Sequence, residues 1–177
     1  MPESNLHKLS ALGQSVWIDN LSRDKIQTGE LERLMREDAV VGVTSNPTIF
    51  QKAIAEGTAY DDQLREILDS GEEDLKEIFL LLSSRDVSDA CDLLRKVWDK
   101  GHGLDGYVSW EVDPNLAYDR EGTIAQRRED EGRYRVEVRD EIALGQSGGR
   151  PEGLVQVRRL DPLGHGSQYR RRRAWGP

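Results

Sequence analysis

The chain has 177 residues, of which 36% are hydrophobic and 33% charged, a composition that allows one domain with a hydrophobic core. Its formal charge of -8 and its pI near 5.0 argue against nucleic acid as a general partner. No apolar run approaches the ~18 residues of a membrane helix, no signal peptide is visible at the N-terminus, and a single cysteine excludes an internal disulfide. We therefore expect a soluble protein of the cytoplasm.

The first predicted strand ends in a carboxylate. A short helix precedes it, with apolar side chains on one side at Leu6, Leu9 and Leu12. Residues 15–19, with the sequence SVWID, are typical of a strand in which Trp17 and Asp19 share one face. A carboxylate at the end of a buried strand is costly unless it is paired or has a function. Asp19 is therefore a candidate catalytic residue, and a cap for the helical segment that begins at Leu21 is the alternative.

The second predicted strand leads into a turn of polar residues. A helical stripe in residues 29–38 precedes VVGVTSNPTIF, residues 40–50. The β-branched run favours a strand buried on both faces, and Pro47 ends it because proline biases the residue before it away from the helical region. Thr44 and Asn46 therefore lie at the carboxyl end of a buried strand, where α/β folds carry their chemistry. A strand-to-helix turn with an ordinary polar cap is the alternative.

Four amphipathic helical segments are predicted between the second and third strands. The first begins at Pro47 and ends at Gly57, and the second closes at Ser70-Gly71. The other two are lined by apolar residues at Leu75, Ile78, Phe79 and Leu82, and at Val87, Cys91, Leu94, Val97 and Trp98. Because Cys91 falls on an apolar stripe, we interpret it as a core residue and not as a nucleophile or ligand. His102, between two glycines, is interpreted as a residue of the helix C-terminus and not as a catalytic one.

Residues 106–112, GYVSWEV, form the third predicted strand. A period of two places Tyr107, Ser109 and Glu111 on one face, and Val108, Trp110 and Val112 on the other, toward the outer helices. Glu111 is again an acid at the carboxyl end of a strand, although a solvent-facing acid is the alternative at any one strand end. Candidates at three consecutive strand ends, Asp19, Thr44/Asn46 and Glu111, together favour a functional site.

Residues 127–177 differ in composition from the rest of the chain. They hold 12 Arg, no Lys and 8 acidic residues, whereas residues 1–126 hold 13 basic and 25 acidic residues. Their hydrophobic pattern is poor, with short apolar stretches at residues 134–138 and 154–157 and glycine-rich segments that are typical of loop or disorder. We predict an irregular or disordered tail, and its Arg- and Gly-rich composition leads to the hypothesis that it is translated out of frame. A natural basic tail that binds RNA or acidic partners is the alternative.

Together these segments resemble the transaldolase family. VGVTSNPTIF is similar to the family's N-terminal signature, LGQSVWIDNLSR to its first barrel strand, and DGYVSWEVDPNLAYDREGTIAQ to its third strand and the loop beyond it. The helix-rich segment 46–103 is similar to the insertion between the second and third strands of the longer bacterial form. The resemblance covers residues 4–126 and stops at Gln126. It implies an α/β fold, a (β/α)8 TIM barrel truncated here to about its first three strands and their helices.

The resemblance also implies a reaction. Transaldolases of the pentose phosphate pathway transfer a dihydroxyacetone unit from sedoheptulose 7-phosphate to glyceraldehyde 3-phosphate through a lysine Schiff base, so sugar phosphates are the expected partners and neither metal nor organic cofactor is needed. Asp19 is then the acid/base for the hydroxyl proton during C–C cleavage, and Glu111 acts with a water on the carbinolamine. Thr44 and Asn46 line the pocket.

The lysine itself is missing from its expected place. In the family it lies on the fourth strand, in a segment resembling N-L-x-I-K-I-P-A-T, whereas the last lysine here is Lys100. The serines and arginine that hold the substrate phosphate are missing as well. We therefore predict an inactive chain that is unstable or aggregates, because three of eight strands leave an open parallel sheet with an unpaired edge and a half-exposed core. A non-catalytic truncated product, an acidic helical interaction protein and a related Schiff-base aldolase are the alternatives, and the oligomeric state does not follow from the sequence.

Overall fold

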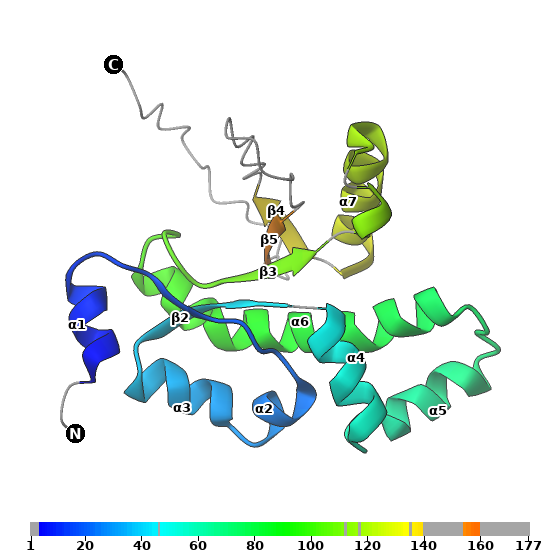
Figure 1. The fold of residues 1–177 in the computed structure, drawn as a ribbon, viewed down its shortest axis with the longest axis horizontal. Helices are drawn as coiled ribbons and strands as arrows, with labels where there is room; N and C mark the ends of the chain where they lie inside the picture. Colours follow the sequence, from blue (N-terminus) through cyan, green and yellow to red (C-terminus); the bar gives the residue numbers. More distant parts are fainter. Residues whose placement is uncertain are drawn as a thin grey trace.

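Three parallel strands and the helices around them form the N-terminal part of the fold (Figure 1). The computed structural model describes residues 4–45, 47–111, 113–116, 118–134, 136–139 and 154–159. The elements up to the third strand are α1 (Asn5–Ala11), β1 (Val16–Ile18), α2 (Arg23–Gln27), α3 (Glu30–Glu37), β2 (Val40–Thr44), α4 (Pro47–Glu56), α5 (Asp61–Asp69), α6 (Leu75–Lys100) and β3 (Tyr107–Glu111). They are followed by the 3-10 helix η1 (Pro114–Leu116), α7 (Arg120–Tyr134), β4 (Val136–Arg139) and β5 (Leu154–Arg159).

The strands form one sheet in the order β1-β2-β3-β5-β4. β1 and β2 are parallel, with Ile18 opposite Val43, and β2 and β3 are parallel, with Thr44 opposite Ser109. This confirms the predicted arrangement of three parallel strands with helical connections. β5 pairs antiparallel with β3, and β4 pairs antiparallel with β5. Among the described residues the sheet is open, as predicted, and it ends at β1 and β4, whereas β3 is paired on both sides because β5 covers its outer edge.

β4 and β5 lie in the segment that the composition predicts to be irregular or disordered. They overlap the two short apolar stretches of the tail, in which β-branched and leucine side chains favour strands. α7 runs through the change of composition at Gln126 and ends at Tyr134. Residues 140–153 and 160–177 lie outside the described residues, so the prediction of an irregular tail stays a prediction there.

α6 is one continuous helix of 26 residues where the sequence predicts two. The predicted break between Leu82 and Val87 is wrong, because residues 83–86 are polar but contain neither glycine nor proline. The Ser83 hydroxyl donates a hydrogen bond to the Phe79 carbonyl at 2.7 Å, one turn back along the helix. The carboxylate of Asp86 accepts a hydrogen bond from Arg23 of α2. Within the described residues no helix, α6 included, combines the length and the apolar composition that a bilayer crossing requires.

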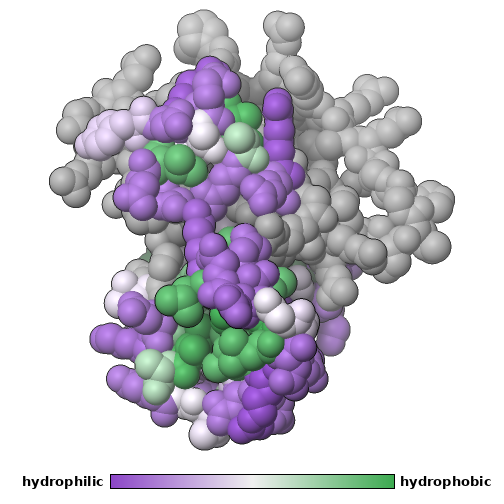
Figure 2. Space-filling model, turned by 90° about the vertical axis from the view of Figure 1, so that its right-hand side faces the viewer, coloured by the Kyte–Doolittle hydropathy of each residue, from purple (hydrophilic) through white to green (hydrophobic). Residues whose placement is uncertain are grey.

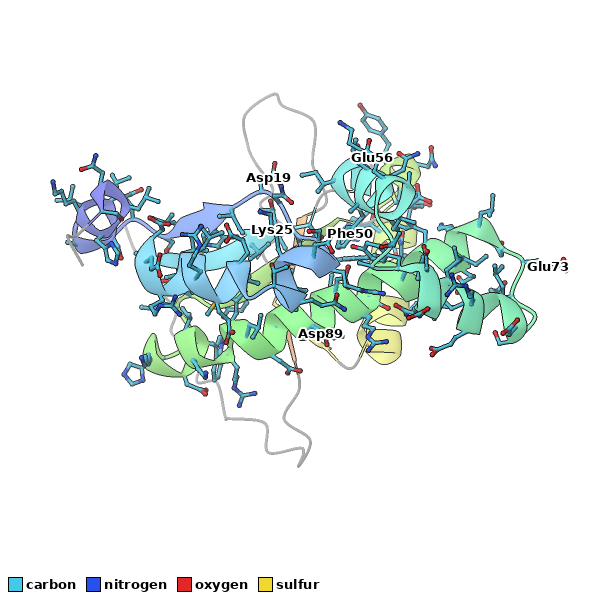
Figure 3. The ribbon with its side chains drawn as sticks, turned by 90° about the horizontal axis from the view of Figure 1, so that it is seen from below. Asp19, Lys25, Phe50, Glu56, Glu73 and Asp89 are labelled. Carbon is cyan, nitrogen blue, oxygen red and sulfur yellow. The ribbon has the colours of Figure 1, made fainter. Side chains whose placement is uncertain are left out.

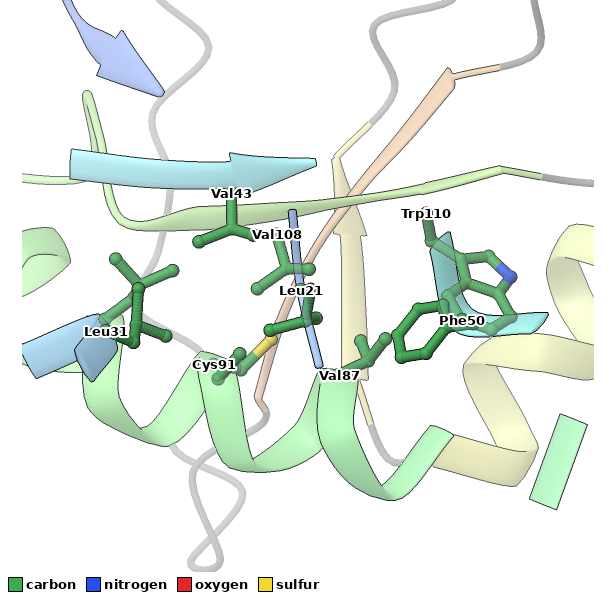
Figure 4. Packing of buried hydrophobic residues seen from close by; sticks show 10 residues of the cluster. Leu21, Leu31, Val43, Phe50, Val87, Cys91, Val108 and Trp110 are labelled. Atoms are coloured by element: carbon green, nitrogen blue, oxygen red, sulfur yellow. The ribbon is translucent and has the colours of Figure 1, made fainter. Parts of the chain in front are cut away.

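The main hydrophobic core lies between the sheet and α6 (Figure 4). Its buried members come from the strands, from α6 and from the segments between them: Leu21, Leu31, Val43, Phe50, Val87, Ala90, Cys91, Leu94, Val108 and Trp110. Cys91 is buried among them, as the apolar stripe predicts, and Trp110 faces the helices, as strand alternation predicts. Fully burying a side chain of this kind stabilises the fold by about 1.5–3 kcal/mol. A second cluster joins α5 to α6 through Tyr60, Ile67, Ile78 and Leu82.

Candidate active site

The candidate site lies where the three parallel strands end. Asp19 follows β1 directly, Thr44 is the last residue of β2 and Glu111 is the last residue of β3. Because neighbouring parallel strands run in the same direction, their carboxyl ends meet at one edge of the sheet. The structure therefore brings the three predicted strand ends to the same edge.

The two faces of the sheet are distinct. Val43 and Val108 belong to the core against α6, so their strand neighbours Thr44 and Ser109 belong to the opposite face. On that face the indole ring of Trp17 lies against the backbone of Gly42, where a Cβ atom would overlap the ring. Gly42 is therefore required for close packing between β1 and β2 on the side of the sheet that carries Thr44.

Asp19 and Thr44 are in direct contact. The Thr44 hydroxyl donates a hydrogen bond to the Oδ1 atom of Asp19, although the two residues are 25 positions apart in sequence. Asp19 is exposed, and Figure 3 shows it at the loop between β1 and α2, on the opposite side of the view from Asp89 of α6. A solvent-accessible carboxylate oriented by a hydroxyl can accept and return a proton, which is the chemistry of a general acid/base.

The turn that leads to Asn46 is anchored on β3. Ser45 is buried, and both its backbone N–H and its hydroxyl donate hydrogen bonds to the Ser109 carbonyl, at 2.9 and 2.6 Å. These bonds hold the chain between the end of β2 and the start of α4. Asn46 itself and the side chain of Glu111 lie outside the described residues, so the roles assigned to them stay predictions.

The loop after β3 is tied to two helices. Asp113 forms an ion pair with Lys76 of α6 at 2.9 Å, and its backbone N–H donates to the side chain of Gln126 in α7 at 3.2 Å. The hydrogen bond from Lys76 lowers the pKa of Asp113, and the same contact raises the pKa of Lys76. Lys76 is thus a protonated ion-pair partner that supports the loop next to Glu111.

Sequence reasoning missed two features near the site. Ser109 is 1% exposed, and its hydroxyl has no hydrogen-bond partner within the described part of the chain. Its only signal was a polar residue on the same strand face as Glu111. The second feature is a buried cluster of Arg23, Tyr60 and Asp86, whose only signal was the polar run inside α6.

The residues of the candidate site lie in a segment that matches a known protein family. The sequence model described as Transaldolase/Fructose-6-phosphate aldolase matches residues 16–129, which is more than half of the chain. The chain belongs to this family. The match includes Asp19, Thr44 and Glu111, and it confirms the resemblance of the N-terminal part to transaldolases.

Curated relatives named transaldolase share about half of their residues with this chain. The relative from Acidothermus cellulolyticus is 53% identical over 123 residues, and that from Parafrankia sp. (strain EAN1pec) is 50% identical over 123 residues. Each alignment covers 70% of this chain and 33% of the relative. The relative from Mycolicibacterium smegmatis is 51% identical over 122 residues, covering 69% of this chain and 33% of the relative. The chain therefore spans about a third of the length of the curated transaldolases that it matches.

Proposed function

We propose that this chain carries the acid-bearing part of a transaldolase site, and that it does not catalyse dihydroxyacetone transfer by itself. In this proposal β1, β2 and β3 correspond to the first three strands of a (β/α)8 barrel. The observation that carries it is the contact between Asp19 and Thr44 at the carboxyl edge of parallel strands, within the residues that match the family.

The second half of the proposal rests on the position of the lysines. All six lysines of the chain lie on helices: Lys8 on α1, Lys25 on α2, Lys52 on α4, and Lys76, Lys96 and Lys100 on α6. A Schiff-base lysine must project from the same strand edge as the acids, because imine formation and C–C cleavage involve adjacent carbons of one substrate. No lysine of this chain lies on a strand, and Lys76 is engaged with Asp113.

The proposed division of labour follows the positions of the side chains. In a complete site that includes the Schiff-base lysine, Asp19 takes the hydroxyl proton of the ketose phosphate as the C3–C4 bond breaks and the protonated imine accepts the electron pair, and it returns a proton to the aldehyde acceptor when the new bond forms. Thr44 orients the carboxylate of Asp19 and helps to position the water that Glu111 uses at the carbinolamine, while Asn46 binds the dihydroxyacetone moiety. Sugar phosphates are thus the proposed partners, and the cytoplasm is the proposed location.

Borohydride trapping tests whether the chain can form a Schiff base. The protein is incubated with fructose 6-phosphate, reduced with sodium borohydride and weighed by intact-mass spectrometry, with the transaldolase of Mycolicibacterium smegmatis treated in parallel. We expect a mass increase for the relative and none for this chain, and no turnover of fructose 6-phosphate with erythrose 4-phosphate. Measurable turnover would show that the chain is an enzyme as it stands, and a covalent adduct on a single lysine would show that it can form a Schiff base.

A chimera tests the assignment of the acids. Residues from 127 onward are replaced by the corresponding remainder of the Acidothermus cellulolyticus transaldolase, which is 53% identical over the matched part. We expect the chimera to transfer dihydroxyacetone, and Asp19→Asn in the chimera to lower kcat by about 100-fold or more, as removal of a general acid/base does. Asp24→Asn, on the exposed side of α2, is the matched control and should leave kcat unchanged. An Asp19→Asn chimera with full activity would reject the assignment.

An acidic helical interaction protein is the second candidate, favoured by the surface of α5 and α6. Leu68 and Leu75 are 50% and 82% exposed near the α5–α6 connection. Acidic residues surround them in sequence, at Asp69, Glu72, Glu73 and Asp74. Figure 2 shows apolar side chains gathered on the lower part of this end of the molecule, with hydrophilic ones around them. This candidate would be favoured if the chimera is inactive and if proteins that bind the chain no longer bind its Leu68→Ser variant.

The origin of the tail is a separate part of the proposal. We infer from the switch to arginine without lysine after Gln126 that residues 127–177 are read out of frame. The nucleotide sequence around codon 126 tests this, because another frame should encode a lysine-bearing fourth strand. A continuous frame, with the tail confirmed by mass spectrometry, would reject it.

A further inference from the structure

Arg23, Tyr60 and Asp86 form a buried polar cluster where α2, the start of α5 and the middle of α6 meet. The Nε atom of Arg23 donates to Oδ1 of Asp86 at 2.8 Å, and the Tyr60 hydroxyl donates to Oδ2 of Asp86 at 2.7 Å. The other guanidinium nitrogens donate to the carbonyls of Ala59 and Leu82, at 3.4 and 3.0 Å. The guanidinium carbon also lies 4.3 Å from the centre of the Tyr60 ring. The cluster thus joins three helical segments through a single arginine.

The cluster also provides a hydrogen-bond acceptor for the N-terminus of α2. The backbone N–H of Arg23 donates to the Tyr60 hydroxyl oxygen at 3.0 Å, in a first helical turn that offers no intrahelical acceptor. Burial raises the pKa of Tyr60, so the phenol stays protonated and can donate to Asp86. Burial also raises the pKa of Asp86, while the hydrogen bonds from Tyr60 and Arg23 oppose that rise.

Asp19 depends on the backbone on both sides of it for its position. Its side chain is exposed, and the contact that the structure describes for it is the hydrogen bond from Thr44. On one side β1 is paired with β2, and on the other side Leu21 is buried in the core (Figure 4). Arg23 follows two residues later and is anchored on α5 and α6. The loop of residues 19–22 is therefore held between the sheet and the helical insertion.

A buried ion pair is a poor way to gain stability alone. Replacing such a pair with apolar side chains of similar volume is often neutral or stabilising, because both charges lose their hydration on burial. Apolar side chains do not reproduce the directional hydrogen bonds of an arginine, because the planar guanidinium binds its partners at fixed angles. The cluster is therefore better suited to fixing the geometry of the loop than to raising the stability of the fold.

We propose that Arg23, Tyr60 and Asp86 are positioning residues that hold the loop of residues 19–22 so that the Asp19 carboxylate meets the Thr44 hydroxyl. The helical insertion between β2 and β3 then has a role in the site, because it supplies Tyr60 and Asp86. This inference rests on the proposed function only in assigning Asp19 as the acid/base.

NMR of the full chain tests the proposal without substrate. The readouts are the 13Cγ chemical shift of Asp19 and the 13Cβ chemical shift of Thr44, because these carbons carry the two hydrogen-bonded oxygens. In the triple variant Arg23→Met, Tyr60→Phe, Asp86→Leu we expect a folded protein by circular dichroism, a shifted Asp19 13Cγ signal and a shifted Thr44 13Cβ signal. A folded triple variant with both signals unchanged would overturn the proposal.

Two further variants and a control complete the test. Tyr60→Phe removes one hydroxyl and serves if the triple variant does not fold; we expect a smaller displacement of the Asp19 signal, and no displacement counts against the proposal. Thr44→Val supplies the 13Cγ value of Asp19 without its hydrogen bond. Ile67→Ala makes a cavity in the second cluster and should leave the Asp19 13Cγ signal unchanged. If Ile67→Ala shifts this signal as much as the triple variant does, the shift reports a general loosening of the fold and the proposal is rejected. An inactive chimera would reject the proposed function and leave these NMR results standing.

Discussion

Replacing Asp86 with leucine removes the acceptor of two hydrogen bonds and leaves the Arg23 guanidinium buried without its counter-ion. The exposed fraction of the side chain is 6% for Arg23 and 0% for Asp86, so neither water nor dissolved ions can take the place of the carboxylate. Removing one partner of such a pair costs about 3–5 kcal/mol. Because domains are stable by only about 5–15 kcal/mol in total, we expect Asp86→Leu to lower the urea midpoint by a large fraction.

Adding Arg23→Met to Asp86→Leu should recover part of that loss. The double variant no longer buries an unpaired charge. Its remaining cost comes from the Tyr60 hydroxyl without an acceptor, about 1–3 kcal/mol, and from the Ala59 and Leu82 carbonyls, which lose the guanidinium donor. Urea unfolding followed by tryptophan fluorescence measures the free energy of unfolding of each variant, since Trp110 is part of the core. The reasoning is refuted if Asp86→Leu costs less than about 1 kcal/mol, or if the double variant is as unstable as the single one.

Three other predictions concern single positions. Gly42→Ala should destabilise the fold by about 1–3 kcal/mol, because the new methyl group overlaps the Trp17 ring; Trp17→Leu should relieve part of this loss, and a fully additive double variant would contradict the explanation. Ala39 has a φ of 54°, in the left-handed region that glycine adopts more easily than alanine, so Ala39→Gly should raise the free energy of unfolding by up to about 1 kcal/mol. Ala55→Gly, on the exposed side of α4, is the control and should lower the free energy of unfolding by about the same amount. A lower Tm for Ala39→Gly would argue against backbone strain at this position. Lys76 lowers the pKa of Asp113, so their ion pair stabilises the fold at every pH above 3.8, the ordinary pKa of aspartate. This contribution is below about 1 kcal/mol, because the pair is exposed, and it is lost as the pH falls through the lowered pKa of Asp113. Lys76→Gln should therefore move the titration of Asp113, followed by its 13Cγ signal, to higher pH, and an unchanged titration would exclude the coupling.

Local pattern is enough to place most elements of this fold. The β-branched run before Pro47 predicts β2, the apolar stripe of residues 29–38 predicts α3, and the amphipathic segment that closes at Ser70-Gly71 predicts α5, because side-chain periodicity reflects which face is buried. The same reasoning put Asp19 and Thr44 at strand ends, where the structure has them. It failed for α6, since a polar run in the middle of a helix has the same pattern as a connection between two helices.

The partners of polar residues depend on distant parts of the chain. Arg23 and Asp86 are 63 positions apart, and no local feature of either residue indicates that it is buried. β5 likewise covers the edge of β3 through a pairing with residues more than 40 positions away, which short apolar stretches alone do not predict. Such contacts form when helices and strands cross, so only the assembled structure reveals them.

The sequence by itself determined the family, the order of the three parallel strands, and the residue types at each strand end, because these depend on motifs and on local periodicity. Only the tertiary structure decided which of those residues meet. Thr44 reaches Asp19 because the parallel register of β1 and β2 places the end of one strand beside the end of the other. The loop that carries Asp19 is fixed by an arginine whose partners belong to a distant helix, and burial of that helix against the sheet is what brings them together.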